Sequence, residues 1–324
     1  MTHNFRVNRR RFLKSALTAC SATLAGTLLE KLTDASENTL QQKKNIHFGF
    51  SLYGMRSLKT AEALKTCAEI GYDSVELVAN QGWPCDPQAL SPKARKEIRG
   101  RLQDLNLKLP ALMENLHVVV DQKQHRNNLD RIQAAGGLGQ DLSPEHPPLI
   151  ETILGGKPQQ WEQIKGKMVA GLKDWAKAAG KAKTVIAIKA HVGGALHTPH
   201  DAKWLVNEVD SPWIKLAYDF SHFQLRNFDL KKSLQAMIDQ SVFIHVKDKT
   251  GNVGKFRFLL PGDGDIDYVS YFTLLKQSSY RGGVVVEVSG QIHGKPGYDP
   301  VQAAKRSYTN LAPAFHKAGL RNSV

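Results

Sequence analysis

Cysteine is scarce in this chain, with three among 324 residues. Cys20 lies near the N-terminus, and only Cys67 and Cys85 lie further along, with no pair at the spacing of a zinc site. This scarcity excludes a disulfide framework or a zinc knuckle as the basis of the fold. Cys67 falls within a helical pattern of apolar residues, where a free thiol ordinarily acts as a small buried hydrophobe.

The chain also has no long apolar run and fewer acidic than basic residues. No stretch approaches the ~20 strongly apolar residues of a membrane-spanning helix, so we expect no stable membrane insertion. Acidic residues number 30 against 44 basic ones, which gives a net charge of +14. The lysines are scattered over predicted helix faces and are not interleaved with aromatic residues. We therefore interpret the excess charge as a solvated surface and expect no nucleic-acid partner.

Residues 1–35 have the pattern of an export signal. Two consecutive arginines, Arg9 and Arg10, precede an Arg-Phe-Leu-Lys sequence and a weakly apolar run of small residues. This arrangement is typical of a twin-arginine signal peptide, and a basic tail is the alternative. We therefore expect export by the twin-arginine machinery to the periplasm or another extracytoplasmic compartment. Residues 36–45 are expected to form a polar linker.

From residue 46 onward, strand patterns and helix patterns alternate without interruption. Eight strands are expected, at residues 46–50, 74–78, 107–113, 147–156, 184–189, 213–219, 241–248 and 282–289. This order predicts an α/β fold with a single (β/α)8 TIM barrel over residues 46–318 and a C-terminal tail at residues 319–324. A doubly wound open sheet is the alternative, but no glycine-rich phosphate-binding turn follows an early strand.

Residues of metal-ligand type end the last three predicted strands. Asp219, His245 and Glu287 each lie within an otherwise apolar run. The carboxyl ends of barrel strands line the active site, and a charged group in an apolar run must be paired or coordinated. Two carboxylates and an imidazole suit one divalent ion such as Mn, Zn, Co or Mg. The alternative is a metal-free cluster in which His245 bridges the two carboxylates.

Four motifs in the second half of the chain carry a family resemblance. They are LAYDFSHF (216–223), FIHVKDKTG (243–251), LPGDGDIDY (260–268) and GVVVEVSG (283–290). The chain resembles sugar isomerase/epimerase proteins with a xylose isomerase-like TIM barrel. The resemblance implies one metal, held by a glutamate, an aspartate, a histidine and a second glutamate at the ends of strands five to eight. Asp219, His245 and Glu287 match the last three ligands, and His222 matches a position that contacts the sugar.

The chain departs from this pattern at Lys189, which stands where the family has its first glutamate. A protonated amine cannot ligate a metal, so His191 and Glu114 are the candidates for the missing ligand. The resemblance also implies a proton shuttle between two glutamates in the family's epimerases, and this shuttle is incomplete here because Lys189 replaces the first glutamate. Glu287 remains as the catalytic base, and Lys189 is expected to pair with a substrate oxyanion or, with its pKa lowered by desolvation, to act as an acid. The alternative is that Lys189 only neutralises a neighbouring carboxylate.

A long loop is predicted over residues 247–267, after the seventh strand. Lys247 lies two residues beyond the proposed ligand His245, and Arg257 is expected to reach an anionic or hydroxyl-rich substrate. The predicted substrate-binding residues are His222, His191, Lys247, Arg257 and Glu114.

Three functions are compatible with these residues. The first is an exported, metal-dependent isomerase or epimerase that removes a proton next to a carbonyl group of a small carbohydrate. The second is a β-eliminating lyase, or a hydrolase, that acts on oxidised (keto) glycosides. The third is a non-catalytic barrel that binds a sugar. A DNA-repair endonuclease of the same fold family would need more histidine and acidic ligands. A homo-oligomer is compatible with all three.

Overall fold

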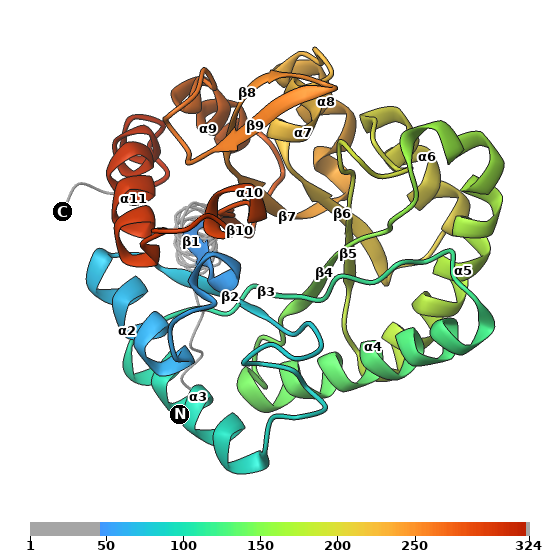
Figure 1. Cartoon of the computed structure of the whole chain (residues 1–324), viewed down its shortest axis with the longest axis horizontal. Coiled ribbons are helices and arrows are strands. Elements are labelled where there is room, and N and C mark those ends of the chain that lie inside the picture. The colour runs from blue at the N-terminus through green and yellow to red at the C-terminus, as the bar shows by residue number, and fades with distance from the viewer. Residues whose placement is uncertain (1–45, 322–324) are drawn as a thin grey trace, which may run out of the picture. The chain divides into compact units, whose positions relative to one another are not determined.

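The computed structural model describes residues 46–321, so the predicted export signal and linker lie outside the described residues. Eight parallel strands close into a barrel in the order β1-β10-β7-β6-β5-β4-β3-β2 (Figure 1). The strands are β1 (His47–Ser51), β2 (Ser74–Val78), β3 (Ala111–Met113), β4 (Leu149–Ile153), β5 (Ile186–Lys189), β6 (Ile214–Tyr218), β7 (Ser241–Val246) and β10 (Gly283–Val286). The prediction of a TIM barrel is confirmed.

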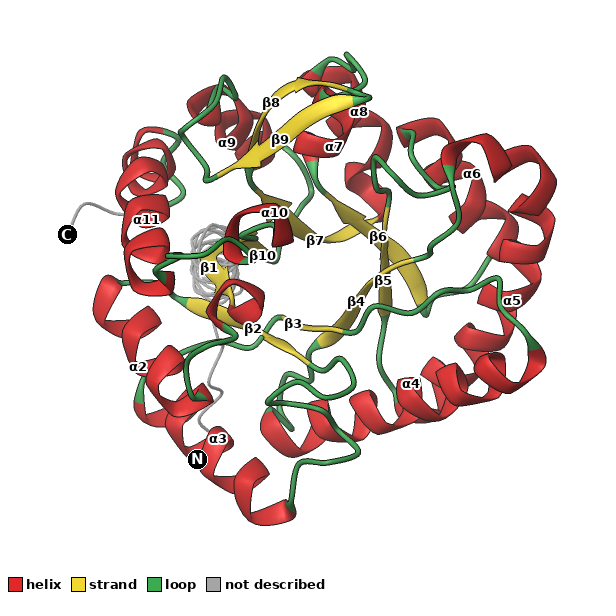
Figure 2. Ribbon diagram, in the orientation of Figure 1, coloured by secondary structure: helices red, strands yellow, loops and turns green. Residues whose placement is uncertain are grey.

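Helices surround the ring of strands, as Figure 2 shows. They are α2 (Thr60–Ile70), α3 (Pro92–Asp104), α4 (Gln122–Leu142), α5 (Trp161–Ala182), α6 (Pro199–Val209), α7 (Phe220–Gln224), α8 (Leu230–Met237), α9 (Tyr268–Gln277), α10 (Gly290–His293) and α11 (Pro300–Lys317). Strands covered in this way are buried on both faces, which explains their near-continuous apolar sequences. Within residues 46–321, no helix is both long and apolar enough to cross a bilayer.

Short-range sequence signals decide where these helices begin. Ser91 caps α3 by accepting a hydrogen bond from the Ala94 N–H at 3.2 Å, and proline occupies the first helical position. Asp121 caps α4 in the same way. Glycine lets α4 pack closely on α5, because a Cβ atom at Gly136 would lie 2.6 Å from the Cβ of Ala182.

The predicted loop after the seventh strand contains a two-stranded antiparallel ribbon. Its strands are β8 (Asp248–Asn252) and β9 (Lys255–Leu259). Gly251 and Gly254 allow the tight turn between them, because their φ angles of 78° and 96° lie in the left-handed region. The ribbon follows β7 directly, so it starts at the carboxyl end of the barrel.

Side chains fill the inside of the barrel in layers. One layer is apolar and consists of Ala111, Ala187, Ala217, Phe243 and Val285. Two positions further along four of these strands stand the polar residues that the sequence singled out, which are Lys189, Asp219, His245 and Glu287. Since side chains of a strand alternate between its two faces, these four also point into the barrel. A charged layer therefore follows the apolar one, at the carboxyl ends of the strands.

Candidate active site

Two buried lysines bind carboxylates at the charged layer. The lysines, these acids and His245 form one polar cluster, which consists of Glu76, Glu151, Lys189, Asp219, His245, Lys247 and Glu287. The Nζ atom of Lys189 lies 3.0 Å from Glu151 Oε1 and 3.1 Å from Glu287 Oε2. The Nζ atom of Lys247 donates to Glu287 Oε2 at 2.7 Å and also to Asp219 Oδ2. Only 3% and 2% of the two lysine side chains are exposed, so little water screens these ion pairs.

His245 is held from two sides. Its Nε2 atom lies 2.9 Å from Glu76 Oε2, while its Nδ1 atom lies 2.9 Å from Lys189 Nζ and 3.3 Å from Glu287 Oε2. Burial and the Lys189 charge lower the pKa of the imidazole, but the carboxylates of Glu76 and Glu287 outweigh them and raise it to about 9. The Glu76 contact fixes the ring so that Nδ1 faces the centre of the cluster.

The amine of Lys189 is charged. Burial by itself would lower its pKa, but the nearby carboxylates of Glu151, Glu287 and Asp219 raise the pKa above its usual value. A lowered pKa, which the sequence suggested for a desolvated amine, is therefore not found, because burial brings the amine among acids. Lys189 acts here as a cation and a hydrogen-bond donor.

Glu287 is the acid of the cluster that reaches furthest towards solvent. Its side chain is 12% exposed, whereas those of Glu151 and Asp219 are 0% exposed. Burial favours the protonated form, but Lys189, Lys247 and protonated His245 hold the pKa of Glu287 well below its usual value. Glu287 is thus an ionised carboxylate at the edge of the cluster.

The donor atoms of the cluster suit a divalent cation. Asp219, His245 and Glu287 each offer one ligand atom, and these atoms lie within 4.8 Å of one another. The imidazole has its other nitrogen held by Glu76, as is usual for a metal-bound histidine. The four acids of the cluster face two lysines, so once His245 gives up its proton to bind an ion, negative charge remains for the cation to neutralise. Lys247 contacts two of the three ligands, so an ion must displace its ammonium group.

Two histidines lie beside the cluster. His222 Nδ1 accepts the Val192 N–H at 3.3 Å, and its Nε2 lies 3.5 Å from Asp219 Oδ2. The ring of His191 lies 4.3 Å from that of His222, and its Nδ1 accepts the Gly193 N–H at 3.2 Å. Burial, reinforced by the nearby ammonium charges, lowers the pKa of His191 to about 4 and that of His222 well below its usual value. Both rings are neutral and suited to hydrogen bonds with hydroxyl groups.

Two residues of the predicted substrate-binding set lie away from the cluster. Glu114 accepts hydrogen bonds from Arg131 at 2.7 Å through each of its carboxylate oxygens, so it does not supply the missing metal ligand. Arg257 is exposed on β9 and alternates with Phe258, whose ring lies 5.0 Å from Lys247 Nζ. Arg257 therefore projects from the opposite face of the ribbon, and its contact with substrate stays a prediction.

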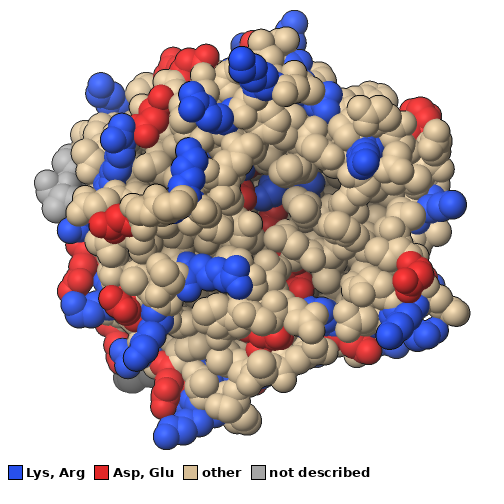
Figure 3. All heavy atoms as spheres, viewed as in Figure 1, with Lys and Arg blue, Asp and Glu red and all other residues tan. Residues whose placement is uncertain are grey.

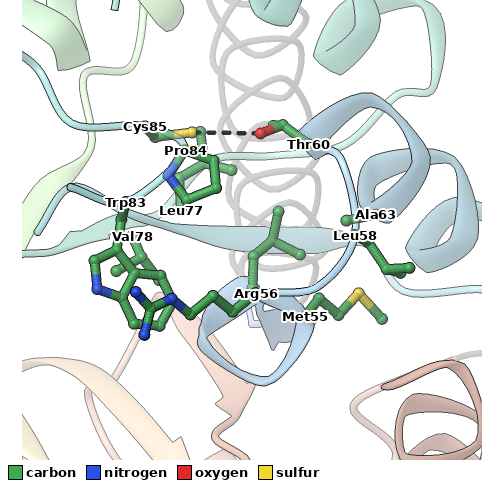
Figure 4. Close-up of a pocket in the computed structure, with 11 residues that line it drawn as sticks. Met55, Arg56, Leu58, Thr60, Ala63, Leu77, Val78, Trp83, Pro84 and Cys85 are labelled. Carbon is green, nitrogen blue, oxygen red and sulfur yellow. Dashed lines mark hydrogen bonds between the residues drawn. The ribbon is translucent and has the colours of Figure 1, made fainter. Parts of the chain in front are cut away.

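An aromatic rim is formed by the loops after β1 and β2. The Trp83 ring stacks on Tyr53 with 5.2 Å between centroids, and the Arg56 guanidinium lies 4.6 Å above the Trp83 ring. Figure 4 shows Arg56 beside Trp83 at a small apolar pocket that includes Met55 and Cys85. The stacking and the cation–π contact hold these three side chains against one another.

Sequence reasoning missed two acids of the cluster. Glu76 and Glu151 are fully buried, single carboxylates inside the apolar strands SVELV and LIETI. The same signal, a charge within an apolar strand, had singled out Asp219. It was available for these two as well, but they lie within strands rather than at the strand ends.

Comparison with known proteins identifies the family. The model of the xylose isomerase-like TIM barrel family matches residues 64–311. The chain therefore belongs to the xylose isomerase-like TIM barrel family, as its motifs indicated.

Curated relatives of this chain include a dehydratase and epimerases. The inosose dehydratase of Lactiplantibacillus plantarum is 26% identical over 177 residues, which are 50% of this chain and 55% of that protein. The L-ribulose-5-phosphate 3-epimerase UlaE of Salmonella paratyphi C is 28% identical over 144 residues, or 44% of this chain and 50% of that protein. The chain thus spans about half the length of the curated relatives it matches.

Solved structures share the fold over most of the chain. The 3-keto-D-glucoside 4-epimerase YcjR of E. coli has a TM-score of 0.65 at 17% identity, over 83% of this chain and 99% of that chain. The IolI protein with a bound zinc atom has a TM-score of 0.69 at 20% identity, over the same shares of 83% and 99%. At these identities the likeness establishes the common architecture.

Proposed function

We propose that this chain is an enzyme that removes a proton from the carbon next to a carbonyl group of a small carbohydrate, with Glu287 as the base. The observation that carries the proposal is an ionised carboxylate whose Oε2 atom lies within 3.1 Å of two ammonium groups. As the proton leaves, negative charge develops on the carbonyl oxygen, and cations beside the base stabilise that charge. The epimerases and dehydratase among the relatives support an enzyme of this kind.

The remaining residues bind and orient the substrate. Lys189 and Lys247 donate hydrogen bonds from charged amines, and the neutral rings of His191 and His222 bind hydroxyl groups. A divalent ion held by Asp219, His245 and Glu287 would polarise a carbonyl or hydroxyl oxygen of the substrate.

Isomerisation or epimerisation is the first candidate outcome, and β-elimination from a keto glycoside is the second. The second is favoured by Lys189, which takes the place of a second carboxylate and leaves Glu287 alone at the exposed edge to return a proton. Incubation of the protein in D₂O with ketoses and with keto glycosides tests both. An epimerase product carries deuterium at the reacting carbon, whereas elimination releases the leaving group. A protein that binds these sugars without exchange or release would be a sugar-binding barrel.

We expect the purified protein to bind one divalent ion and the Lys247→Met variant to bind it at least tenfold more tightly, because the ammonium group competes for Asp219 and Glu287. The matched control is Lys249→Met on β8, which leaves the cluster unchanged. Elemental analysis and metal titration give the readout. Metal content that survives removal of both His245 and Glu287 would place the ion elsewhere.

Export through the twin-arginine route is the second part of the proposal, and it rests on the sequence of residues 1–35. A precursor expressed in a bacterium with a functional twin-arginine system should be shortened and recovered outside the cytoplasm. Exchange of both Arg9 and Arg10 for lysine should block this processing, because the pair is the recognition element. Cell fractionation followed by mass measurement of the protein tests this prediction. Unchanged export of the double variant would contradict the twin-arginine route.

A further inference from the structure

We propose that a second polar pocket beside the candidate active site binds a neutral, hydroxyl-rich unit of the same substrate, so that the substrate is a glycoside with at least two units. This inference rests on the proposed function, because it places the reacting unit at Lys189 and Glu287. It adds a subsite and excludes a phosphorylated ligand from it.

One pocket reaches the candidate active site at Lys189 and His191. It has a volume of about 240 Å³, and Lys189, His191 and the glycine-bearing loops after β4 and β5 line it. Drug-sized ligands generally occupy pockets of ~300 Å³ or more. This pocket therefore suits one sugar ring better than a longer ligand. Its wall includes His117, which comes from the loop after β3.

His117 also lines the second pocket. That pocket has a volume of about 270 Å³ and lies between the loops after β2 and β3 and the first half of α4. Gly155 supports the shared ring, because a Cβ atom there would lie 2.7 Å from His117 Cγ and its φ of 76° favours glycine. The two pockets therefore adjoin at His117, and each can hold one unit of a two-unit ligand. Figure 3 shows the face of the molecule hollowed, with acidic and basic atoms at depth.

Carboxamides dominate the wall of the second pocket. Six of them line it: Asn80, Gln81, Asn115, Gln124, Asn127 and Asn128. Asn128 is buried and donates to the His117 carbonyl at 2.8 Å, while it accepts from Gln124 Nε2 at 2.9 Å. Within residues 46–321, the side chains of Gln81, Asn115 and Asn127 make no hydrogen bond to protein. An amide both donates and accepts, which matches the hydroxyl groups of a sugar.

The charges at this pocket point to a neutral ligand. Glu114 and Arg131 are its two lining residues of fixed charge, and they neutralise each other in a bidentate pair. Arg131 also donates to Asp86 Oδ1 at 3.3 Å and to the Ala79 carbonyl at 2.6 Å. The guanidinium of Arg131 thus makes its hydrogen bonds within the protein. A phosphate or carboxylate would meet no free cation among these described residues, so the pocket suits uncharged hydroxyl groups.

Calorimetric titration of the wild-type protein tests the subsite. The probes are glucose, cellobiose, maltose, 3-keto-glucose, methyl 3-keto-glucoside, 3-keto-cellobiose and glucose 6-phosphate. We expect a two-ring probe to bind at least tenfold more tightly than its one-ring counterpart. The double variant Gln81→Leu/Asn127→Leu should lose that advantage and leave one-ring binding within twofold. Gln103→Leu, an exposed amide on α3, is the matched control and should change neither affinity.

The outcomes separate this inference from the proposed function. Equal affinity for one-ring and two-ring probes, no binding of any two-ring probe, or tightest binding of glucose 6-phosphate each overturns the subsite. An equal loss of affinity for one-ring and two-ring probes in the double variant also overturns the subsite. Deuterium exchange of the one-ring keto probes is measured in parallel. Exchange without a two-ring advantage leaves the proposed function standing, and a two-ring advantage without exchange supports the subsite while it contradicts the proposed base.

Discussion

Replacement of Glu287 by glutamine is expected to lower the rate of proton abstraction by about 10²–10⁴-fold, the range for loss of a positioned base. The amide keeps the shape of the side chain but cannot accept the proton. Folding should be largely retained, because Lys189 keeps Glu151 as a partner and Lys247 keeps Asp219. Deuterium incorporation into the substrate in D₂O measures the rate, and a thermal melt monitors the fold.

Glu162→Gln is the matched control for this experiment. It makes the same chemical change at an exposed carboxylate of α5, which pairs with Lys165 and lines neither pocket. Its exchange rate should stay close to that of the wild-type protein. Undiminished exchange in Glu287→Gln would show that another group takes the proton.

Replacement of Lys189 by methionine should lower turnover by about 10²-fold or more, because the cation beside the developing negative charge is lost. It should also destabilise the fold by about 3–5 kcal/mol, the usual cost of breaking a buried ion pair from one side. Glu151 is 0% exposed, and its side chain would be left without its cationic partner. Chemical denaturation and deuterium exchange measure the two effects separately.

A double variant distinguishes catalysis from neutralisation. Lys189→Met/Glu151→Leu removes both partners of the pair and should recover most of the lost stability, because apolar residues can replace a buried ion pair at little cost. Its turnover should stay at least about 10²-fold below that of the wild-type protein. If the double variant turns over its substrate normally, Lys189 serves only to neutralise Glu151.

Much of the architecture was predictable from local sequence. Strand and helix patterns have periods of two and 3.6 residues, and they report which positions are buried without reference to distant parts of the chain. Eight such units in alternation predicted the closed barrel. The strand ends then located Asp219, His245 and Glu287, because every parallel strand of a barrel ends at the same rim. The antiparallel ribbon after β7 was not predicted, since its strands are short and largely exposed.

Only the tertiary structure decided how these residues pair. Glu76 on β2 meets His245 on β7 although the two lie 169 positions apart, because closure of the barrel brings strands that are not neighbours within reach of each other. Lys189 finds Glu151 because β4 and β5 are neighbours and both residues point inward. Local sequence thus determined which residues face the interior. The charge of each group depends on its neighbours across the barrel, so its protonation followed only from the assembled fold.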